Sequence, residues 1–460
     1  MSFDAFWLPG LESSELLLAD REFGEVAARV PQLAGAQLQQ VIAHIAAARA
    51  QLQQIPVSNI VHAIDAVAAR IAARDTAEGM AARALLPACT GFSRETIEDV
   101  LTHMTADWSR ASLELMLRSE LGNAAVLDAP AVHAPTGRTL FASGPRLAYH
   151  VFSGNVPGVA VTAIIRSLLV KGATLGKTAS GEPVLPVIFA RALADVAPDI
   201  AQALAVTYWP GGSEELEACA LQSADAVVVY GGEETVHSIS ARITPQARLL
   251  VHGPRLSFGI VGREATIAVA RDIAAATAAY DQQGCVSPHV VYVEAGAAFD
   301  AATLARAVAN ELELLAGSQP RRRLSHAEVI AIREARARAE FRAIAGANVG
   351  LFGPQDTSYT VIYDAETKLP VSCLNRTLYV MPVADAEAVT AIVAPHKHVL
   401  QSAAIAGISG VRLHDLARRL ALCGVTRLTS FGMLPWPPMW WHHDGRGPLN
   451  ELLTWHDLEA

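Results

Sequence analysis

From about Pro145 onward, short β-rich runs alternate with helical stretches, and this alternation constrains the fold more than any other feature. Four strand–helix pairs follow one another, at 147–152 and 159–170, 173–177 and 183–196, 205–209 and 213–221, and 226–230 and 235–243. Strands and helices that alternate at this spacing predict βαβ units and a parallel sheet covered on both faces. The expected fold class is therefore α/β.

A second alternating block follows the first. Its expected strands and helices are, in chain order, 256–261, 265–280, 290–293, 301–316, 326–345, 359–363 and 378–382. Ahead of the first block, residues 14–120 carry apolar residues at helical spacing throughout, with helices expected at 37–54, 58–74 and 94–118. We therefore expect two α/β domains, with a helical extension before the first.

Composition excludes several classes of protein. Hydrophobic residues make up 52% of the chain, yet no unbroken apolar run reaches the roughly 20 residues that span a bilayer. Residues 1–12 carry acids and no basic segment, unlike a signal peptide, so a cytoplasmic location is expected. The net charge of -9 disfavours nucleic-acid binding, and the run Arg321-Arg322-Arg323 is interpreted as a solvated face.

One of the five scattered cysteines differs from the rest. Cys285 directly follows Gly284, between the helix expected at 265–280 and the next strand, where a sulfur is exposed to backbone amides that favour a thiolate. The residues alone leave a nucleophile and an inert thiol both open. Without CxxC pairs, neither a disulfide framework nor structural zinc is expected. His396-Lys397-His398 and His442-His443-Asp444 lack a third ligand cluster, so no metal is expected.

Three strand ends in the first block carry polar or glycine residues. Asn155 follows the first strand, where its amide could donate to an oxyanion or merely form a turn. Lys177 ends the second strand, a position at which open α/β sheets bind ligands, although a lysine can also simply end a strand. Gly231-Gly232 follows the fourth strand and would let a phosphate approach, but the GxGxxG fingerprint is missing and a plain turn stays open.

Taken in order, these segments resemble the aldehyde dehydrogenase superfamily and, more narrowly, the acyl-CoA or fatty-acid reductases of the LuxC family. The matching segments are the Asn-x-Pro turn at Asn155, the ribose-binding lysine strand 176–180, the phosphate-facing turn 230–232, the nucleophile loop 282–285, and the tail segments 441–445 and 455–457. The resemblance covers roughly residues 85–460.

The resemblance implies a domain plan. Residues 1–250 would hold the helical extension and a Rossmann-type cofactor domain, and 251–425 the α/β catalytic domain. Residues 426–460 would form an aromatic tail, which together with 124–145 would make up a small oligomerisation element of a homo-oligomer. The cofactor-binding residues it implies are Ser153, Lys177, Ser180, Gly231 and Gly232.

The resemblance also implies a reaction. Cys285 would attack an acyl-CoA or acyl-protein thioester, and Asn155 and the Cys285 amide would form the oxyanion hole. Hydride from the nicotinamide would then release an aldehyde. Two alternatives stay open. One is a cysteine-dependent acyltransferase or thioesterase without redox chemistry, and the other is a scaffolding subunit of an acyl-transfer complex.

Two departures from the family pattern narrow this expectation. The stretch 249–255 lacks the glutamate that activates water in aldehyde-oxidising relatives, which favours reduction. His252 falls near that position and is either a general base toward Cys285 or a structural histidine. Ser180 replaces a ribose-binding glutamate, so NADPH is expected, with NADH as the alternative because Glu182 lies close by.

Overall fold

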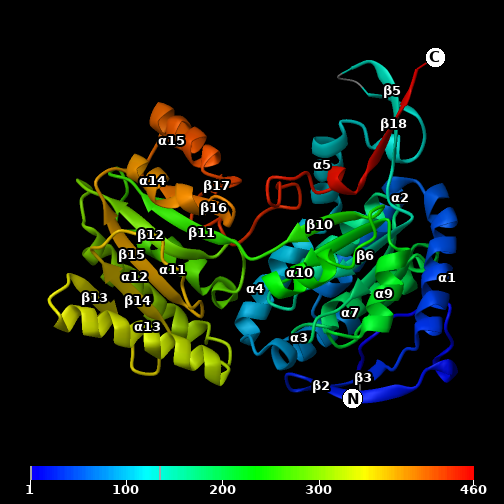
Figure 1. The fold of residues 1–460 in the computed structure, drawn as a ribbon, viewed down its shortest axis with the longest axis horizontal. Coiled ribbons are helices and arrows are strands. Elements are labelled where there is room, and N and C mark those ends of the chain that lie inside the picture. Colours follow the sequence, from blue (N-terminus) through cyan, green and yellow to red (C-terminus); the bar gives the residue numbers. More distant parts are fainter. Residues whose placement is uncertain (1–2, 134–135, 460) are drawn as a thin grey trace. The chain divides into compact units, whose positions relative to one another are not determined.

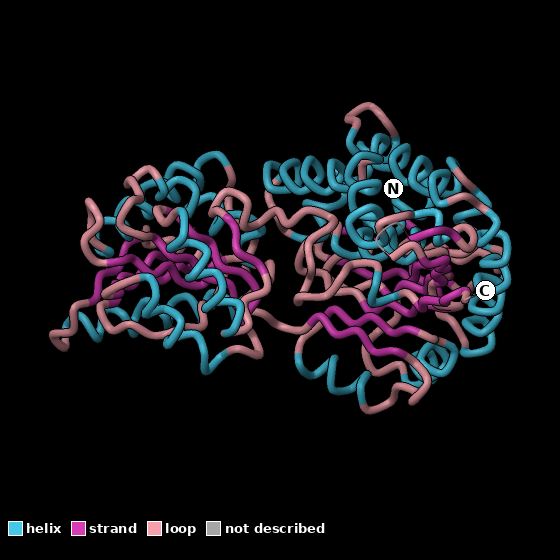
Figure 2. Tube along the Cα trace, turned by 90° about the horizontal axis from the view of Figure 1, so that it is seen from above, coloured by secondary structure: helices cyan, strands magenta, loops and turns pink. Residues whose placement is uncertain are grey.

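The computed structural model describes residues 3–133 and 136–459 (Figure 1). The chain divides into two compact units. Unit 1 contains Met1–Gly91, Ile97–Gly253 and Pro438–Ala460, and unit 2 contains Phe92–Thr96 and Pro254–Pro437. Within each unit, helices lie on both faces of a sheet (Figure 2). The chain therefore leaves unit 1 to build unit 2 and returns at its C-terminal end.

Unit 1 is built on a five-stranded parallel sheet in the order β10-β9-β6-β7-β8. Its strands are β6 (Leu147–Val151), β7 (Ala173–Lys177), β8 (Leu204–Thr207), β9 (Ala226–Tyr230) and β10 (Arg248–His252). The connecting helices are α6 (Val159–Leu169), α7 (Val184–Val196), α8 (Pro198–Ala201), α9 (Glu214–Ser223) and α10 (Glu233–Ser240). The strand order reverses between β6 and β9, and such switch points bind ligands at the carboxyl ends of the strands. The predicted α/β class and parallel sheet are confirmed.

The sequence pattern predicted helices throughout residues 14–120, but the N-terminal part of unit 1 begins with strands. A small sheet comes first, made of β1 (Phe3–Asp4), β2 (Leu18–Phe23) and β3 (Val26–Pro31). Strands β2 and β3 form a hairpin that turns at Gly24, whose φ of +59° only glycine adopts easily. An added Cβ at Gly24 would lie 2.3 Å from the carbonyl oxygen of Cys89, so the turn also packs tightly against a helix end.

Five helices follow this hairpin: α1 (Gly35–Gln54), α2 (Val57–Ala72), α3 (Ala77–Thr90), α4 (Arg94–Asp107) and α5 (Arg110–Leu121). The single helix expected at 94–118 is two helices. Between them Trp108 is fully buried and donates from Nε1 to Thr162 Oγ1 at 3.0 Å, while Ser109 is extended and starts α5. Within the described residues, no single helix is long and apolar enough to cross a membrane. Helices α1 and α2 reach that length and hydropathy only when taken together, and they are bent by 112° relative to each other.

Unit 2 contains a seven-stranded sheet in the order β13-β14-β15-β12-β11-β16-β17, parallel except for the β13–β14 pair. Its strands are β11 (Leu256–Val261), β12 (Pro288–Glu294), β13 (Val349–Phe352), β14 (Thr360–Asp364), β15 (Thr377–Val383), β16 (Leu400–Ala406) and β17 (Arg427–Thr429). Its helices are α11 (Val269–Ala278), α12 (Ala301–Ser318), α13 (His326–Ile344), α14 (Val389–Val393) and α15 (Gly410–Leu422). Helices α11 and α12 pack against the sheet in one hydrophobic core, and helices α14 and α15 pack against it in a second.

The C-terminal tail completes unit 1. Strand β18 (Thr454–Leu458) pairs antiparallel with β5 (Arg138–Ser143), which also pairs with β4 (Ala131–His133). This three-stranded sheet joins part of the segment 124–145 to the end of the chain. The two segments to which the sequence assigned an oligomerisation role thus contribute to one element, whose part in assembly stays a prediction.

Candidate functional site

The loop that carries Cys285 begins with unusual backbone geometry. After α11, Tyr280, Asp281 and Gln282 all have left-handed φ values of 51°, 48° and 63°. Non-glycine residues rarely adopt this conformation, so surrounding contacts must hold it. Cys285 itself is partly exposed, and its carbonyl oxygen accepts a hydrogen bond from Ser257 Oγ at 2.8 Å. The helix expected to reach Tyr280 therefore ends earlier, at Ala278.

A second left-handed run holds this loop in place. Leu374, Asn375 and Arg376 also have positive φ, and the Asn375 amide donates to the Asp281 carbonyl oxygen at 2.9 Å. Asp281 Oδ1 and Arg376 Nε lie 2.6 Å apart in a fully buried ion pair. The side chain of Gln282 bonds both main-chain groups of Thr377. The loop before Cys285 is thus tied to the segment before β15 by buried polar contacts.

Within unit 2, the charge of Arg427 interacts with Cys285. Arg427 begins β17 and donates to the carbonyl oxygens of Leu434 and Met433 at 2.8 and 2.6 Å. Burial lowers the pKa of Arg427 to about 10, and the charge of Cys285 opposes that lowering. A positive charge near a cysteine favours its thiolate. Nothing in the sequence pointed to Arg427, because β17 is only three residues long and was not predicted.

The other four cysteines have different surroundings. Burial is the largest cause that raises the pKa of the thiols of Cys89, Cys219, Cys373 and Cys423. A raised thiol pKa keeps the sulfur protonated and inert near neutral pH.

In unit 1, Asn155 lies in the loop between β6 and α6, at the switch point of the sheet. The side chain is exposed, and Ser153 beside it is half-buried. The loop touches the chain beyond β7, since a Cβ added at Gly154 would lie 2.7 Å from the Glu182 nitrogen. Glycine at 154 therefore allows the two strand-end loops to approach closely beside Asn155, at the carboxyl edge of the sheet.

Lys177 ends β7 with its side chain mostly buried. Its Nζ lies 3.7 Å from Glu217 Oε1 and 5.8 Å from the centroid of the Trp209 ring. Burial lowers the pKa of Lys177, and Glu217 counteracts that effect. Glu217, on α9, also forms an ion pair with Arg242. This acid was missed in the sequence because it lies forty residues beyond Lys177 on a separate helix.

Ser180 and Glu182, the two residues that bear on the choice between NADPH and NADH, differ in burial. Ser180 is exposed, three residues beyond Lys177. Glu182 is buried, and its Oε1 accepts from the amides of Val184 and Leu185 at 2.8 and 2.7 Å, at the start of α7. Burial raises the pKa of Glu182 to about 7. Its carboxyl group is thus engaged by the helix N-terminus.

Gly231 and Gly232 occupy the turn between β9 and α10. Gly232 starts the helix, and a Cβ added there would meet no atom of the described residues within 4 Å. The turn therefore leaves room for a ligand, but the first turn of α10 carries Glu233 and Glu234, whose charges oppose an anion at that end.

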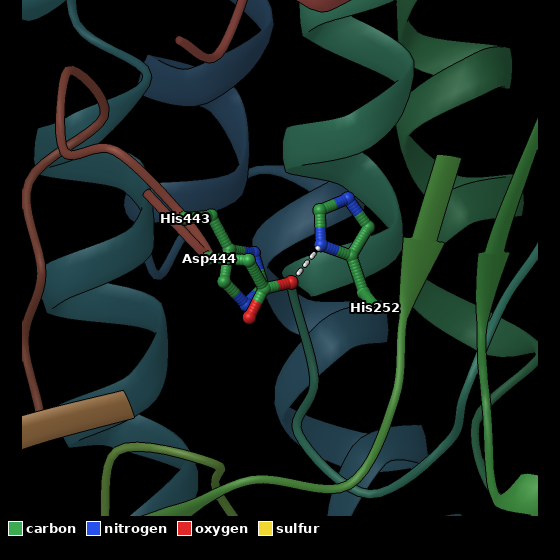
Figure 3. A group of neighbouring side chains, drawn as sticks. All are labelled: His252, His443 and Asp444. Carbon is green, nitrogen blue, oxygen red and sulfur yellow. Dashed lines mark hydrogen bonds and ion pairs between the residues drawn. The ribbon is translucent and has the colours of Figure 1, made fainter. Parts of the chain in front are cut away.

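His252 ends β10 inside a stack of aromatic rings. Its ring lies 4.5 Å from that of Tyr230 and 4.4 Å from that of His443, with small interplanar angles, and His443 stacks in turn on Trp441 at 4.6 Å. His252 Nδ1 lies 2.8 Å from Asp444 Oδ2, and both side chains are almost fully buried (Figure 3). The C-terminal tail thus supplies the partner and one covering ring of a histidine 192 residues earlier in the chain.

Three groups of this cluster could in principle hold a metal ion. One ligand atom each from His252, His443 and Asp444 lies within 4.8 Å of the others. Imidazole lone pairs lie in the ring plane, and zinc binds about 2.0–2.1 Å from the nitrogen. Because the two rings stack at 4.4 Å with only 20° between their planes, one ion cannot lie in both planes. The arrangement suits a hydrogen-bonded histidine better than a metal centre, and the prediction of no metal stays a prediction.

The structure brings some of the predicted site residues together. Asn155, Ser153, Lys177, Gly231, Gly232 and His252 all lie at or just beyond the carboxyl ends of the unit 1 strands. Alternation along the strands places Lys177 on the sheet face packed by α1 and α9, and His252 on the opposite face. Cys285 belongs to unit 2, at the amino end of β12.

Comparison with known proteins identifies the family. The sequence profile of the family described as Acyl-CoA reductase (LuxC) matches residues 52–455. The chain belongs to the LuxC family. The predicted resemblance is thereby confirmed.

Curated relatives of this LuxC family member carry related names. It is 30% identical over 205 residues to a long-chain acyl-protein thioester reductase of Aliivibrio fischeri, a match that covers 42% of each chain. It is 29% identical over 217 residues to that of Photorhabdus luminescens, covering 44% of this chain and 43% of the relative. The matched part thus spans less than half the length of these curated relatives.

Solved structures confirm the expected fold of this LuxC family member. A methylmalonate-semialdehyde dehydrogenase from Oceanimonas doudoroffii superposes with a TM-score of 0.77 at 12% identity, covering 100% of this chain and 98% of that one. An NADP-dependent glyceraldehyde-3-phosphate dehydrogenase from Bacillus halodurans, complexed with NADP, superposes with a TM-score of 0.73 at 13% identity and covers 100% of both chains. The fold is that of the aldehyde dehydrogenases, as predicted.

Proposed function

We propose that this protein reduces an acyl thioester to an aldehyde with a nicotinamide cofactor, through a covalent acyl group on Cys285. The observation that carries the proposal is the Cys285 loop, fixed by the buried Asp281–Arg376 pair and accompanied by the Arg427 charge, in a chain of the LuxC family. The names of the curated relatives support an acyl-protein or acyl-CoA thioester as the substrate.

The residue roles follow the chemistry of acyl transfer. The Cys285 thiolate forms a bond to the acyl carbon, and the bond to the thiol of the donor breaks, so that the donor leaves as a thiolate that takes up a proton. The Asn155 side-chain amide and the Cys285 main-chain amide would donate to the oxygen that becomes negative, a contribution of about 3 kcal/mol per donor. His252 is the proposed general base for the Cys285 thiol.

The carboxyl edge of the unit 1 sheet fits a nicotinamide dinucleotide. A mostly buried cation at Lys177, the tight Gly154 contact and the open position at Gly232 are features that a dinucleotide site uses. When bound, the cofactor supplies the hydride that converts the acyl thioester on Cys285 to the aldehyde level. Lys177, Ser180, Ser153, Gly231 and Gly232 are the residues proposed to hold it.

NADPH is the proposed cofactor, with NADH as the alternative. Ser180 offers no carboxylate to repel a 2′-phosphate, and the Glu182 carboxyl group is engaged by α7. Glu217 favours NADH, because its charge lies beside Lys177. The test compares kcat/KM for NADPH and NADH in the wild type and in Glu217→Gln. NADPH preference in the wild type that increases in the variant supports the proposal, and NADH preference in both contradicts it.

The function is tested by incubating the protein with a panel of acyl-CoAs plus NADPH or NADH and following nicotinamide absorbance. Loss of absorbance that requires Cys285 is the expected result. Thiol release without nicotinamide oxidation would instead indicate an acyltransferase or thioesterase. Absence of any thiol burst from acyl-CoA would indicate a scaffolding subunit. A homo-oligomer assembled through the segments 124–145 and 426–460, the domain plan and a cytoplasmic location remain predictions.

A further inference from the structure

We infer that Asp444 is a positioning residue that holds His252 in one tautomer, with Nδ1 protonated and Nε2 left as the basic nitrogen. The inference rests on the proposed function, in which His252 serves as the general base. It assigns a role in that chemistry to the C-terminal tail, which the family resemblance left without one.

The first observation is the hydrogen bond itself. An ionised carboxylate only accepts hydrogen bonds, so at 2.8 Å from Asp444 Oδ2 the Nδ1 atom of His252 must carry the proton. Arg446 donates to the Val251 carbonyl oxygen at 2.6 Å and lies 3.4 Å from Asp444 Oδ2, which favours the charged carboxylate. The neutral imidazole then has its lone pair on Nε2, the atom that can accept a proton.

The second observation is the geometry of the segment that carries Asp444. His443 and Arg446 form an antiparallel bridge, and the two residues between them, Asp444 and Gly445, have φ values of 54° and 75°. Positive φ at both central positions is the signature of a type I′ turn, which strongly prefers Asn-Gly or Asp-Gly. The local sequence thus forms a rigid turn, and the turn directs the carboxylate toward His252 (Figure 3).

The third observation is how firmly this turn is attached to unit 1. Arg166, buried on α6, donates to the Met439 carbonyl oxygen at 3.1 Å. Beyond the turn, Arg248 donates to the carbonyl oxygens of Glu451 and Leu453 at 2.6 and 3.0 Å. The ring stack fixes the plane of the His252 imidazole between Tyr230 and His443. Both partners of the Asp444–His252 bond are therefore preorganised, as a positioning interaction requires.

Carboxylates lie near both ring nitrogens of His252. Glu451 Oε1, from the tail, lies 3.7 Å from Nε2, while Asp444 lies at Nδ1. Arg446 pairs with both carboxylates, 3.4 Å from Asp444 Oδ2 and 3.2 Å from Glu451 Oε2. The neighbouring imidazoles stay neutral, because burial lowers the pKa of His443 well below the usual range and that of His150, on β6, to about 3. Two carboxylates therefore lie beside the His252 imidazole, one at each nitrogen.

Asp444→Asn is the informative variant, because asparagine keeps the Asn-Gly turn chemistry but removes the charge. The acylation rate of Cys285, measured as thiol release from acyl-CoA, should fall on the order of 100-fold. ¹⁵N NMR of labelled histidine should show the His252 proton shifting from Nδ1 toward Nε2. The combined Asp444→Asn and His252→Ala variant should be no slower than His252→Ala alone, because the two residues act as a unit.

His442→Asn, a change at the exposed neighbouring position, is the matched control and should leave both signals unchanged. An Asp444→Asn protein with the wild-type rate overturns the inference. A slow Asp444→Asn protein with an unchanged His252 tautomer also overturns it, since the role would then be structural. If the wild type forms no acyl-enzyme, the proposed function fails, whereas the NMR comparison still decides whether Asp444 fixes the tautomer.

Discussion

Asp281 and Arg376 form an ion pair in which both side chains are fully buried, with 2.6 Å between Oδ1 and Nε. Asp281 Oδ2 also accepts from the Arg322 amide at 2.9 Å, so the carboxylate joins three segments of unit 2. Removing one member of a buried pair leaves an uncompensated charge, which typically destabilises by about 3–5 kcal/mol. Arg376→Met should therefore lower the free energy of unfolding by about that amount in urea titrations.

A double variant separates charge from packing in this pair. Asp281→Asn keeps a side chain suited to the left-handed φ of 48° and retains an acceptor for Arg322. Asp281→Asn combined with Arg376→Met leaves no unpaired charge, so it should be more stable than Arg376→Met alone. Equal instability of the two variants would contradict this account. Arg110→Ala, which breaks an exposed pair with Glu114, should leave the unfolding midpoint unchanged.

Cys285→Ala should abolish covalent acylation. Intact-mass spectrometry after incubation with an acyl-CoA and no nicotinamide should show the added acyl mass in the wild type and not in the variant. Cys423→Ala is the matched control and should acylate normally, because burial raises the pKa of that thiol. Acyl mass retained in Cys285→Ala would show that another residue is the nucleophile.

Arg427→Gln should raise the pKa of the Cys285 thiol, because it removes the nearby positive charge that stabilises the thiolate. A shift of one pH unit makes alkylation of Cys285 by iodoacetamide roughly tenfold slower at pH 7. The measurement is the pH profile of the alkylation rate. Arg427→Lys should recover part of the rate, and Arg418→Gln, at an exposed position of α15, should have no effect. Identical profiles for Arg427→Gln and wild type would remove Arg427 from the site.

Asn155→Ala should slow acylation by about 100-fold to 1000-fold if its amide donates to the developing oxyanion. Nicotinamide binding, followed by fluorescence titration, should change little. Asn59→Ala, at an exposed position of α2, is the control. A wild-type acylation rate in Asn155→Ala would leave Asn155 as a turn residue only.

His150 should make the protein sensitive to acid. Both ring nitrogens are buried, and burial lowers the pKa of His150 to about 3. Because the unfolded histidine titrates near pH 6.5, the unfolded state binds the proton first as the pH falls. The stabilisation from a neutral His150 is complete above about pH 6.5 and is lost progressively toward pH 3, by about 2 kcal/mol at pH 5.

His150→Leu tests this linkage. The wild type loses about 2 kcal/mol of stability as the pH falls from 7 to 5, and the variant does not. The free energy of unfolding of His150→Leu minus that of the wild type should therefore rise by about 2 kcal/mol over that fall in pH. Contributions from other groups, such as Glu182, cancel in this difference. His62→Leu, at an exposed position of α2, should run parallel to the wild type. A pH-independent difference for His150→Leu would mean that His150 titrates normally.

The sequence predicted those features that depend on neighbours along the chain. The bounds of β7, β9 and β11 agree with the predicted runs, since each is a short segment between helices and turns, and β9 is apolar throughout. Asn155 and Cys285 were found through local motifs at element ends. The hairpin at Gly24 was missed, since its strands mix charged and apolar residues and lack a continuous apolar run like that of β9.

The partners of the candidate site residues could not be predicted in the same way. Glu217, Arg427 and Asp444 carry no local signal that relates them to Lys177, Cys285 and His252. Each relationship depends on the path of the chain through the sheet, and two of the three bring together residues more than a hundred positions apart. The left-handed run at Tyr280 was likewise hidden, since tertiary contacts hold it against the intrinsic preference of its residues.

Because unit 1 receives its last elements after unit 2 in the sequence, its site is completed late during synthesis. The ribosome must add 192 residues between His252 and Asp444. At about 5–20 residues per second, roughly 10 to 40 s pass before the carboxylate exists. During that time His252 has neither its hydrogen-bond partner nor the His443 ring, and unit 2 is itself complete only at Pro437, so both units reach their final form within the last residues of synthesis.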